Sequence, residues 1–222
     1  MERKPESEAI AEMAEARRFN EVMRRNRFRQ EDYQRLARLA VDMGVPPGGK
    51  VLDMGTGPGF VAIEVAKLLQ GTGCRVVGMD LSGAMLALAA ENAADAGQNG
   101  ILSWREGDVK AMPFADGEFD LIVSNDSLHH WDGPLLVFDE IARVLKEDGR
   151  CVVHDSKRLL HWWPWLLVKL FSLSIPRDFR VHWYNSIKSS YTQDELRAIL
   201  GRSRLTGWRI EESFMDLMVV RA

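Results

Sequence analysis

The chain has only two cysteines, Cys74 and Cys151, among its 222 residues. They are far apart, and each lies inside an apolar run that is typical of a strand. We therefore expect two reduced thiols in the core of a cytosolic protein rather than a disulfide framework. No metal site is predicted either.

Long apolar segments are also missing. No stretch reaches the roughly 18 uninterrupted apolar residues that a membrane-spanning helix needs. The first 18 residues lack the apolar run of a signal peptide. An excess of positive charge is absent too, because the formal net charge is -3, whereas domains that bind nucleic acid are usually basic. These absences favour a cytoplasmic protein without a nucleic-acid partner.

What the sequence does contain is one alternating series of strand and helix patterns, and its length favours a single domain, residues 1–222. Strands separated by helices of ten to fifteen residues predict an α/β fold, with a parallel sheet covered by helices on both faces. The predicted strands are Lys50–Met54, Cys74–Asp80, Ile101–Glu106, Phe119–Ser124 and Arg150–His154; the predicted helices are Phe60–Leu69, one capped by Ser82, one from Pro134 to a stop at Gly149, and one after Thr192 that ends at Leu200.

The two ends of the chain differ from this pattern. Residues from about Ser7 to Met43 predict two helices, which form most of an N-terminal helical cap, residues 1–46. The strand-like runs Trp208–Phe214 and Leu217–Arg221 are separated by only two residues. Strands so close must be antiparallel, because a parallel return needs a crossover of about a dozen residues.

Three glycines alternate directly after the first predicted strand. Gly55, Gly57 and Gly59 have no Cβ, so the loop can turn sharply and expose backbone N–H groups at the start of a helix. Asp53 adds a carboxylate, which suits a positively charged ligand. A nicotinamide site has G-x-G-x-x-G spacing, which this loop lacks. The loop therefore indicates a nucleoside ligand with a cationic end.

Asp80 ends the second predicted strand about 20 residues after the glycine loop, the spacing at which an acid binds ribose hydroxyls in nucleotide sites. Its alternative role is to cap the next helix, for which Ser82 is better placed. Leu81 and Met85 can form an apolar wall for a purine.

Asp108 and Val109 follow the third predicted strand. The Asp108 carboxylate can accept from an exocyclic amine, and the Val109 N–H can donate to a ring nitrogen. The alternative for Asp108 is a simple turn.

With these motifs, the chain resembles the class I S-adenosylmethionine-dependent methyltransferases over VLDMGTGPG, GMDLS and EGDVKAMPFADGEFDLIVSNDSLHHW. It looks most like the small-molecule branch that contains ubiquinone and menaquinone C-methyltransferases. The resemblance implies a Rossmann-like doubly wound sheet of seven strands, order 3-2-1-4-5-7-6, with strand 7 antiparallel. The implied cofactor is S-adenosyl-L-methionine, and the predicted contacts are Asp53, Gly55, Thr56, Gly57, Gly59, Asp80, Leu81, Met85, Asp108, Val109, Ser124 and Asn125.

The implied reaction is methyl transfer to a small, apolar or aromatic metabolite. DNA-base and glutamine-amide methyltransferases carry an Asn/Asp-Pro-Pro-aromatic motif after the fourth strand, where this chain has Ser124–Ser127. The resemblance therefore argues against those substrates. A non-catalytic regulatory protein that binds the same cofactor is the alternative from another class.

Three histidines near the predicted strand ends are candidate catalytic residues. His129, His130 and His154 titrate near neutral pH and can act as a general base. The alternative is structural packing, because methyl transfer to an already anionic nucleophile needs little acid–base help and proximity supplies much of the rate.

Two further segments have unusual composition. Residues 157–191 form a variable insertion that the resemblance assigns to covering the substrate, and residues 159–173 within it are rich in tryptophan and aliphatic residues. They predict a lid, a core or dimer contact, or a membrane-surface contact of an enzyme that acts on a quinone-like lipid. Residues Arg17–Arg29 contain six arginines and one acid, typical of a solvated helix face.

Overall fold

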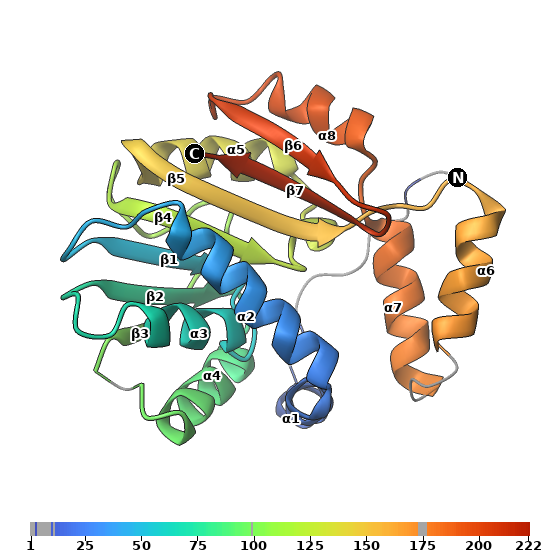
Figure 1. The fold of residues 1–222 in the computed structure, drawn as a ribbon, viewed down its shortest axis with the longest axis horizontal. Helices are drawn as coiled ribbons and strands as arrows, with labels where there is room; N and C mark the ends of the chain where they lie inside the picture. The colour runs from blue at the N-terminus through green and yellow to red at the C-terminus, as the bar shows by residue number, and fades with distance from the viewer. Residues whose placement is uncertain (1–2, 4–9, 11, 99, 173–176) are drawn as a thin grey trace.

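A computed structural model describes residues 3, 10, 12–98, 100–172 and 177–222; within these, the side chains of residues 163, 167, 171, 177–179 and 182 are not described. The described chain forms a seven-stranded sheet of order β3-β2-β1-β4-β5-β7-β6 (Figure 1). The strands β1 to β5 are parallel, and β7 runs antiparallel to both β5 and β6. The predicted strand order and the antiparallel seventh strand are therefore confirmed. The strands are β1 Lys50–Met54, β2 Arg75–Asp80, β3 Leu102–Glu106, β4 Phe119–Asn125, β5 Leu145–Ser156, β6 Trp208–Glu212 and β7 Asp216–Arg221.

The two central strands are buried on both faces, as expected for a parallel sheet covered by helices. Residues 51–54 of β1 and 119–124 of β4 are all buried, and Val51 pairs with Leu121. The helices that cover the faces are α3 Phe60–Leu68, α4 Gly83–Asp95, α5 Pro134–Val144 and α8 Gln193–Leu200. One core cluster packs α2 and α3 against the sheet, and the other packs α5 and α8 against its opposite face.

Local capping signals in the sequence correspond to real helix starts. Ser82 accepts a hydrogen bond from the Met85 N–H and caps α4. Thr192 and Glu195 form a reciprocal capping box at α8. Both satisfy backbone donors that would otherwise lack a partner at the helix N-terminus.

Helix α2 Arg27–Asp42 lies along one face of the sheet, and α1 Met13–Arg25 lies beyond the N-terminal end of α2, beside α4 (Figure 1). Asn26 separates them and accepts from the Arg29 N–H as the cap of α2. Two helices are thus confirmed, while the predicted start near Ser7 lies outside the described residues. Helix α1 packs on α4, and α2 packs on α3, where Tyr33 stacks on Phe60 with ring centroids 5.4 Å apart.

The helix predicted to stop at Gly149 ends earlier, at Val144, so that prediction is wrong. Leu145 has extended backbone angles and pairs with Phe119 of β4. Strand β5 therefore starts at Leu145, five residues before the predicted start at Arg150. A Cβ on Gly149 would lie 2.8 Å from the Leu145 side chain. Gly149 therefore allows close packing inside an irregular strand rather than ending a helix. The other strand ends lie within two residues of their predicted positions.

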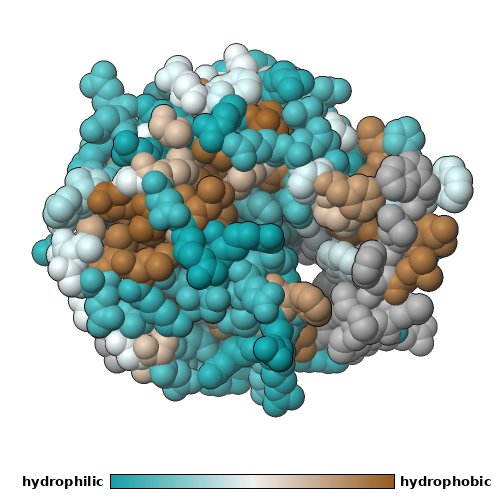
Figure 2. Space-filling model, viewed as in Figure 1, coloured by the Kyte–Doolittle hydropathy of each residue, from teal (hydrophilic) through white to brown (hydrophobic). Residues whose placement is uncertain are grey.

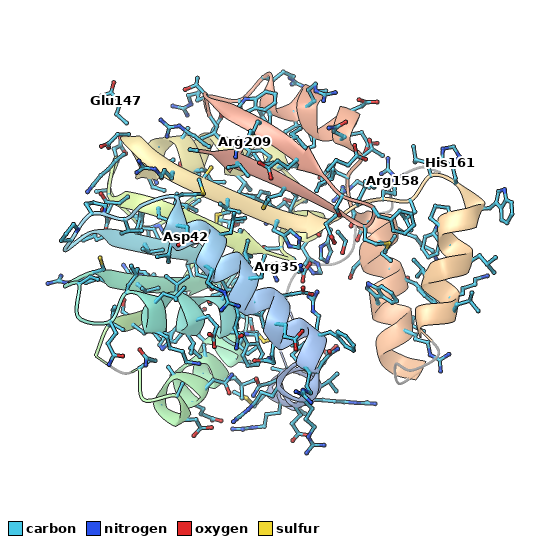
Figure 3. The ribbon with its side chains drawn as sticks, in the orientation of Figure 1. Arg35, Asp42, Glu147, Arg158, His161 and Arg209 are labelled. Atoms are coloured by element: carbon cyan, nitrogen blue, oxygen red, sulfur yellow. The ribbon has the colours of Figure 1, made fainter. Side chains whose placement is uncertain are left out.

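Helices α6 Trp162–Phe171 and α7 Arg177–Ser189 form a hairpin beside the carboxyl end of the sheet (Figure 1). Arg158 lies at its base (Figure 3), where its guanidinium donates to the Ser190 carbonyl and pairs with Glu195. Leu159, Val168 and Ile187 are buried between the two helices. The hairpin thus has its own small core and is joined at its base to α8 by an ion pair.

Phe138 is fully buried in the core, whereas Leu136 in the same helix α5 is 57% exposed. We expect Phe138→Ala to lower the free energy of unfolding by about 3–5 kcal/mol, because it removes buried apolar area and leaves a cavity. Leu136→Ala should change it by less than about 0.5 kcal/mol. Denaturant unfolding of both variants measures the difference, and equal losses would contradict the described core.

Candidate functional site

A cavity of about 1300 Å³ lies at the carboxyl ends of the parallel strands. The ends of β1, β2 and β4 form its floor, and α1 and α2 line one side. Trp183 and Lys188 of α7 line the other side, so that the molecule is hollowed between its main body and the hairpin (Figure 2). The fold thus brings the N-terminal helices and part of the insertion of residues 157–191 to the same cavity.

The glycine loop is shaped by positive backbone φ angles. Gly55, Gly57 and Gly59 have φ of 69°, 53° and 81°, a region that residues with a Cβ rarely adopt. A Cβ on Gly55 would lie 2.3 Å from the Ser127 hydroxyl oxygen, and one on Gly59 would lie 2.8 Å from the Trp104 ring. Glycine is therefore required both for the turn and for the close contacts beside the cavity.

Asp53 lines the cavity at the end of β1, but its carboxylate also holds the loop together. Its Oδ2 accepts from the Thr56 hydroxyl at 2.6 Å and from the Ala62 N–H at 3.0 Å. Burial raises the pKa of Asp53 to about 7, although these two hydrogen bonds oppose the rise. Asp53 therefore has a structural role in addition to the predicted contact with the cationic end of the ligand.

Asp80 fixes the glycine loop from the neighbouring strand. Its Oδ2 accepts from the Gly57 N–H at 2.8 Å, and its Oδ1 accepts from the Ser82 N–H at 2.9 Å. Burial raises the pKa of this carboxyl group, while these N–H donors oppose the rise. Both oxygens face backbone donors at the edge of the cavity, which positions the carboxylate firmly.

The residues predicted around the nucleoside converge on the same cavity. Leu81, Met85, Asp108, Val109 and Asn125 all line it. Leu81 is 45% exposed, so an apolar surface is open to a ligand there. Asp108 also accepts from the N–H of the residue two positions later at 2.8 Å, so the turn that the sequence left as an alternative is present as well.

Ser124 is different from its neighbours. Its side chain is fully buried, and its hydroxyl donates to the Met54 carbonyl at 2.7 Å. It is not part of the cavity wall. The side chain of Ser124 therefore cross-links β4 to β1, and the cofactor contact predicted at this residue stays a prediction. Thr56 does line the cavity, although its hydroxyl is bonded to Asp53.

The three candidate histidines have distinct surroundings. His129 is nearly buried and lines the cavity, with Nδ1 at 2.8 Å from Asp155 Oδ1. His130 also lines the cavity, with its ring centroid 4.1 Å from that of His129. His154 is bonded through Nδ1 to Asn125 at 2.8 Å and is not part of the cavity wall.

An ion pair between Arg29 and Asp126 joins α2 to the loop after β4, and sequence reasoning missed it. Asp126 has a φ of 50°, which is uncommon for a residue with a Cβ. Burial alone would raise its pKa, yet the charge of Arg29 lowers it. The prediction of a solvated helix face for residues Arg17–Arg29 is therefore wrong at Arg29. The sequence offered no signal for the pairing, since the partners are 97 positions apart.

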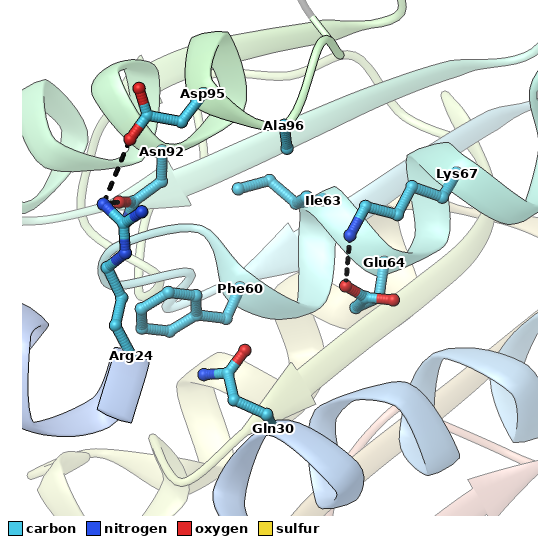
Figure 4. Close-up of a pocket in the computed structure, with 9 residues that line it drawn as sticks. All are labelled: Arg24, Gln30, Phe60, Ile63, Glu64, Lys67, Asn92, Asp95 and Ala96. Carbon is cyan, nitrogen blue, oxygen red and sulfur yellow. Dashed lines mark hydrogen bonds and ion pairs between the residues drawn. The ribbon is translucent and has the colours of Figure 1, made fainter. Parts of the chain in front are cut away.

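A second depression, of about 200 Å³, lies among helices α2, α3 and α4 (Figure 4). Ion pairs between Arg24 and Asp95 and between Lys67 and Glu64 lie along it. It contains none of the predicted site residues. We therefore assign the candidate site to the larger cavity.

Residues 52–153 match the family described as "Methyltransferase domain". Malonyl-[acyl-carrier protein] O-methyltransferase of Legionella pneumophila is 34% identical over 148 residues, which is 59% of this chain and 48% of that protein. Sterol 24-C-methyltransferase ERG6B of Gibberella zeae is 35% identical over 117 residues (53% and 30%). The 2-phytyl-1,4-naphtoquinone methyltransferase of Synechocystis sp. is 34% identical over 112 residues (50% and 47%). The matched regions thus span less than half the length of these curated relatives.

Solved structures show the same fold. A Methanococcus maripaludis protein of the S-adenosyl-L-methionine-dependent methyltransferase kind superposes with a TM-score of 0.75 at 21% identity, covering 99% of this chain and 96% of that one. A SAM-dependent methyltransferase of Aquifex aeolicus gives 0.66 at 19% identity, covering 94% and 97%. The family match and the relatives place residues 52–153 in the methyltransferase-domain family. The sheet order is that of the class I S-adenosylmethionine-dependent methyltransferases.

The raised pKa of Asp53 predicts a pH effect on stability. Its value is about 7 in the folded protein and 3.8 for an unperturbed carboxyl, so the folded chain holds a proton there that the unfolded chain releases. The free energy of unfolding contributed by Asp53 is therefore largest below about pH 4 and falls as the pH rises to about 7, by at most ~1.4 kcal/mol per pH unit.

Asp53→Asn removes this titration while keeping an acceptor for Thr56 and Ala62. The stability of the wild type relative to this variant should fall between about pH 4 and about pH 7, measured by denaturant unfolding. A difference that stays constant with pH would show that Asp53 does not retain its proton.

Proposed function

We propose that this chain binds S-adenosyl-L-methionine and transfers its methyl group to a small, apolar or aromatic acceptor. The observation that carries the proposal is the contact between Asp80 and the glycine loop. The Asp80 carboxylate accepts from the N–H groups of Gly57 and Ser82, and the loop has positive φ angles that favour glycine. The cofactor supplies a methyl group on a positively charged sulfur. No nucleic-acid partner is proposed.

The residues of the site suit the parts of such a cofactor. Asp80 is placed to accept from the two ribose hydroxyls, since charge-assisted hydrogen bonds to a carboxylate are strong. Leu81 and Met85 offer apolar surface to the purine, and Asp108 an acceptor for its amine. Asp53 and the backbone around Gly55 are left for the amino-acid end of the cofactor.

Asp80→Ala should weaken binding of S-adenosylhomocysteine by about 10- to 100-fold, because hydrogen bonds to a charged group contribute about 1.5–3 kcal/mol. Calorimetric titration measures the affinity. Asp148→Ala, which removes an exposed acid on β5 away from the cavity, serves as the control. The proposal fails if the wild type shows no binding at millimolar ligand, or if both variants bind equally well.

The size and lining of the cavity support an apolar acceptor beside the cofactor. Single ligand pockets usually have volumes of about 300–1,000 Å³, and this one is about 1300 Å³. Phe19, Tyr33, Trp183 and Met215 line the part contributed by the N-terminal helices, α7 and the β6–β7 turn. The names of the relatives give malonyl-[acyl-carrier protein], a sterol and a naphthoquinone as their substrates, and the last two agree with an apolar metabolite.

We further propose that the outer side of α6 contacts a membrane surface, which would suit a quinone-like lipid as acceptor. Trp162, Leu166 and Leu170, at i, i+4 and i+8, are 78%, 53% and 56% exposed, and hydrophobic atoms gather over α6 at the edge of the molecule (Figure 2). Residues 157–191 carry six Lys and Arg and one acid. Tryptophan favours the lipid interface, and basic residues are attracted by anionic lipids.

Among the described residues, none of the helices combines the length and the apolar character that crossing a bilayer requires. The covering role of residues 157–191, the cap formed by residues 1–46 and a cytoplasmic location remain part of this proposal. A regulatory protein that binds the cofactor without turnover is the remaining alternative. It would be favoured if the cofactor bound tightly and no acceptor were methylated.

Replacing Trp162, Leu166 and Leu170 together with serine should reduce binding to vesicles of phosphatidylglycerol by tenfold or more, because apolar burial in the interface supplies the affinity. Leu68→Ser, on α3 and 44% exposed, is the matched control. Vesicle flotation separates bound from free protein. Equal flotation of the two variants, or none by the wild type, would exclude this contact.

A further inference from the structure

His129 and Asp155 form a buried pair at the floor of the cavity. His129 lies in the short 3-10 helix Leu128–His130 just after β4, and Asp155 lies near the end of β5. The two strands are adjacent and parallel, with Asn125 paired to His154. This register brings side chains 26 positions apart into contact, with 4% exposure for His129 and 1% for Asp155.

The Asp155 carboxylate fixes His129 at two points. Its Oδ2 accepts from the His129 backbone N–H at 2.8 Å, and its Oδ1 lies 2.8 Å from the ring Nδ1. A carboxylate can only accept from the ring, so Nδ1 carries the proton in this contact. In the neutral imidazole, Nε2 then carries the lone pair, on the side of the ring turned away from Asp155.

We propose that Asp155 is a positioning residue that holds His129 as the proton acceptor of the methyl-transfer site, and that the acceptor substrate loses a proton during the reaction. This inference rests on the proposed function and adds the chemical class of the substrate to it. His129 combines a place in the cavity wall with a buried carboxylate partner.

Other charged and titratable groups face this pair from the elements packed around it. The ring of His130 packs against that of His129 at an interplanar angle of 40°, and Asp126 interacts electrostatically with His129. The Arg3 guanidinium donates to the His129 carbonyl at 3.0 Å and lies over the Tyr191 ring. Tyr191 feels the charge of Asp155, although burial is the main cause of its raised pKa. Asp155 and Asp126 are thus acids that interact with His129, Asp126 is itself paired with Arg29, and Arg3 is a cation bonded to the His129 carbonyl.

The proton balance distinguishes among acceptors. A carbon of an electron-rich ring or a phenolic oxygen must release a proton when it gains a methyl group. The acceptor's electron pair then forms the bond to the methyl carbon, the carbon–sulfur bond breaks with its pair left on sulfur, and the acceptor's proton passes to His129 Nε2 and then to water. A carboxylate acceptor needs no base. The pair therefore points to a carbon or hydroxyl nucleophile such as a quinol, rather than to a carboxylate.

The first test reads the histidine directly, without a substrate. Nitrogen-15 NMR of the ring nitrogens, with S-adenosylhomocysteine bound, should show neutral His129 with the proton on Nδ1, and Nε2 should gain a proton reversibly when the ring becomes charged. His129→Gln assigns the signals. Asp155→Asn should remove the preference for the Nδ1 tautomer. A proton on Nε2 in the wild type, or no change in Asp155→Asn, would overturn the proposal.

The second test measures methyl transfer to two probes: a 2-alkyl-1,4-naphthoquinol kept reduced, and malonyl coenzyme A. We expect transfer to the naphthoquinol to fall about 100-fold or more in His129→Gln, as for loss of a general base, and the acid limb of its pH–rate profile to move in Asp155→Asn. Asp148→Asn, at an exposed position of β5 away from the cavity, should leave the rate unchanged.

Methylation of malonyl coenzyme A alone, or transfer to the naphthoquinol that is unaffected by His129→Gln, would contradict the assignment. If neither probe is methylated, the NMR result decides. Binding of S-adenosylhomocysteine should be the same in wild type, His129→Gln and Asp155→Asn. Its absence in the wild type would contradict the proposed function rather than the role of this pair.

Discussion

The parallel pairing of β1 with both β2 and β4 is the constraint on which the rest of the site depends. Parallel strands end at one edge of the sheet, so the glycine loop, Asp80 and the loop after β4 must meet there. Asp80 then secures the arrangement by accepting from the Gly57 N–H. The chemistry of the site follows from this edge, since donors, acceptors and apolar surface from separate segments face one cavity.

Polar groups at this edge serve structure and function together. Asp53 binds Thr56 and the start of α3, and its burial raises its pKa to about 7. Asp155 fixes both the backbone and the ring of His129. Such bonded carboxylates keep the loops in one conformation, which reduces the reorganisation needed when a ligand binds. The cost is a set of buried acids whose protonation depends on pH.

Much of this arrangement was predictable because its signals are local. The glycine spacing and the acids after the strands identified the part of the cavity wall that the strand ends provide, and the two-residue gap near Asp216 identified the antiparallel end of the sheet. Predictions failed where a distant partner decides. Gly149 suggested a helix end, but pairing of Leu145 with Phe119 extends β5 through it. The structural role of Ser124 was likewise not predictable, because the partner of its hydroxyl, the Met54 carbonyl, lies on another strand.

The sequence by itself determined the order and type of the elements, the loop that requires glycine, and the resemblance to a methyltransferase, because backbone preference and hydrophobic period are properties of neighbouring residues. Only the tertiary structure decided that His129 has Asp155 as a carboxylate partner and that Arg29 pairs with Asp126 at the cavity wall. Those contacts join residues 26 and 97 positions apart. They depend on strand register and helix packing, which no local pattern specifies.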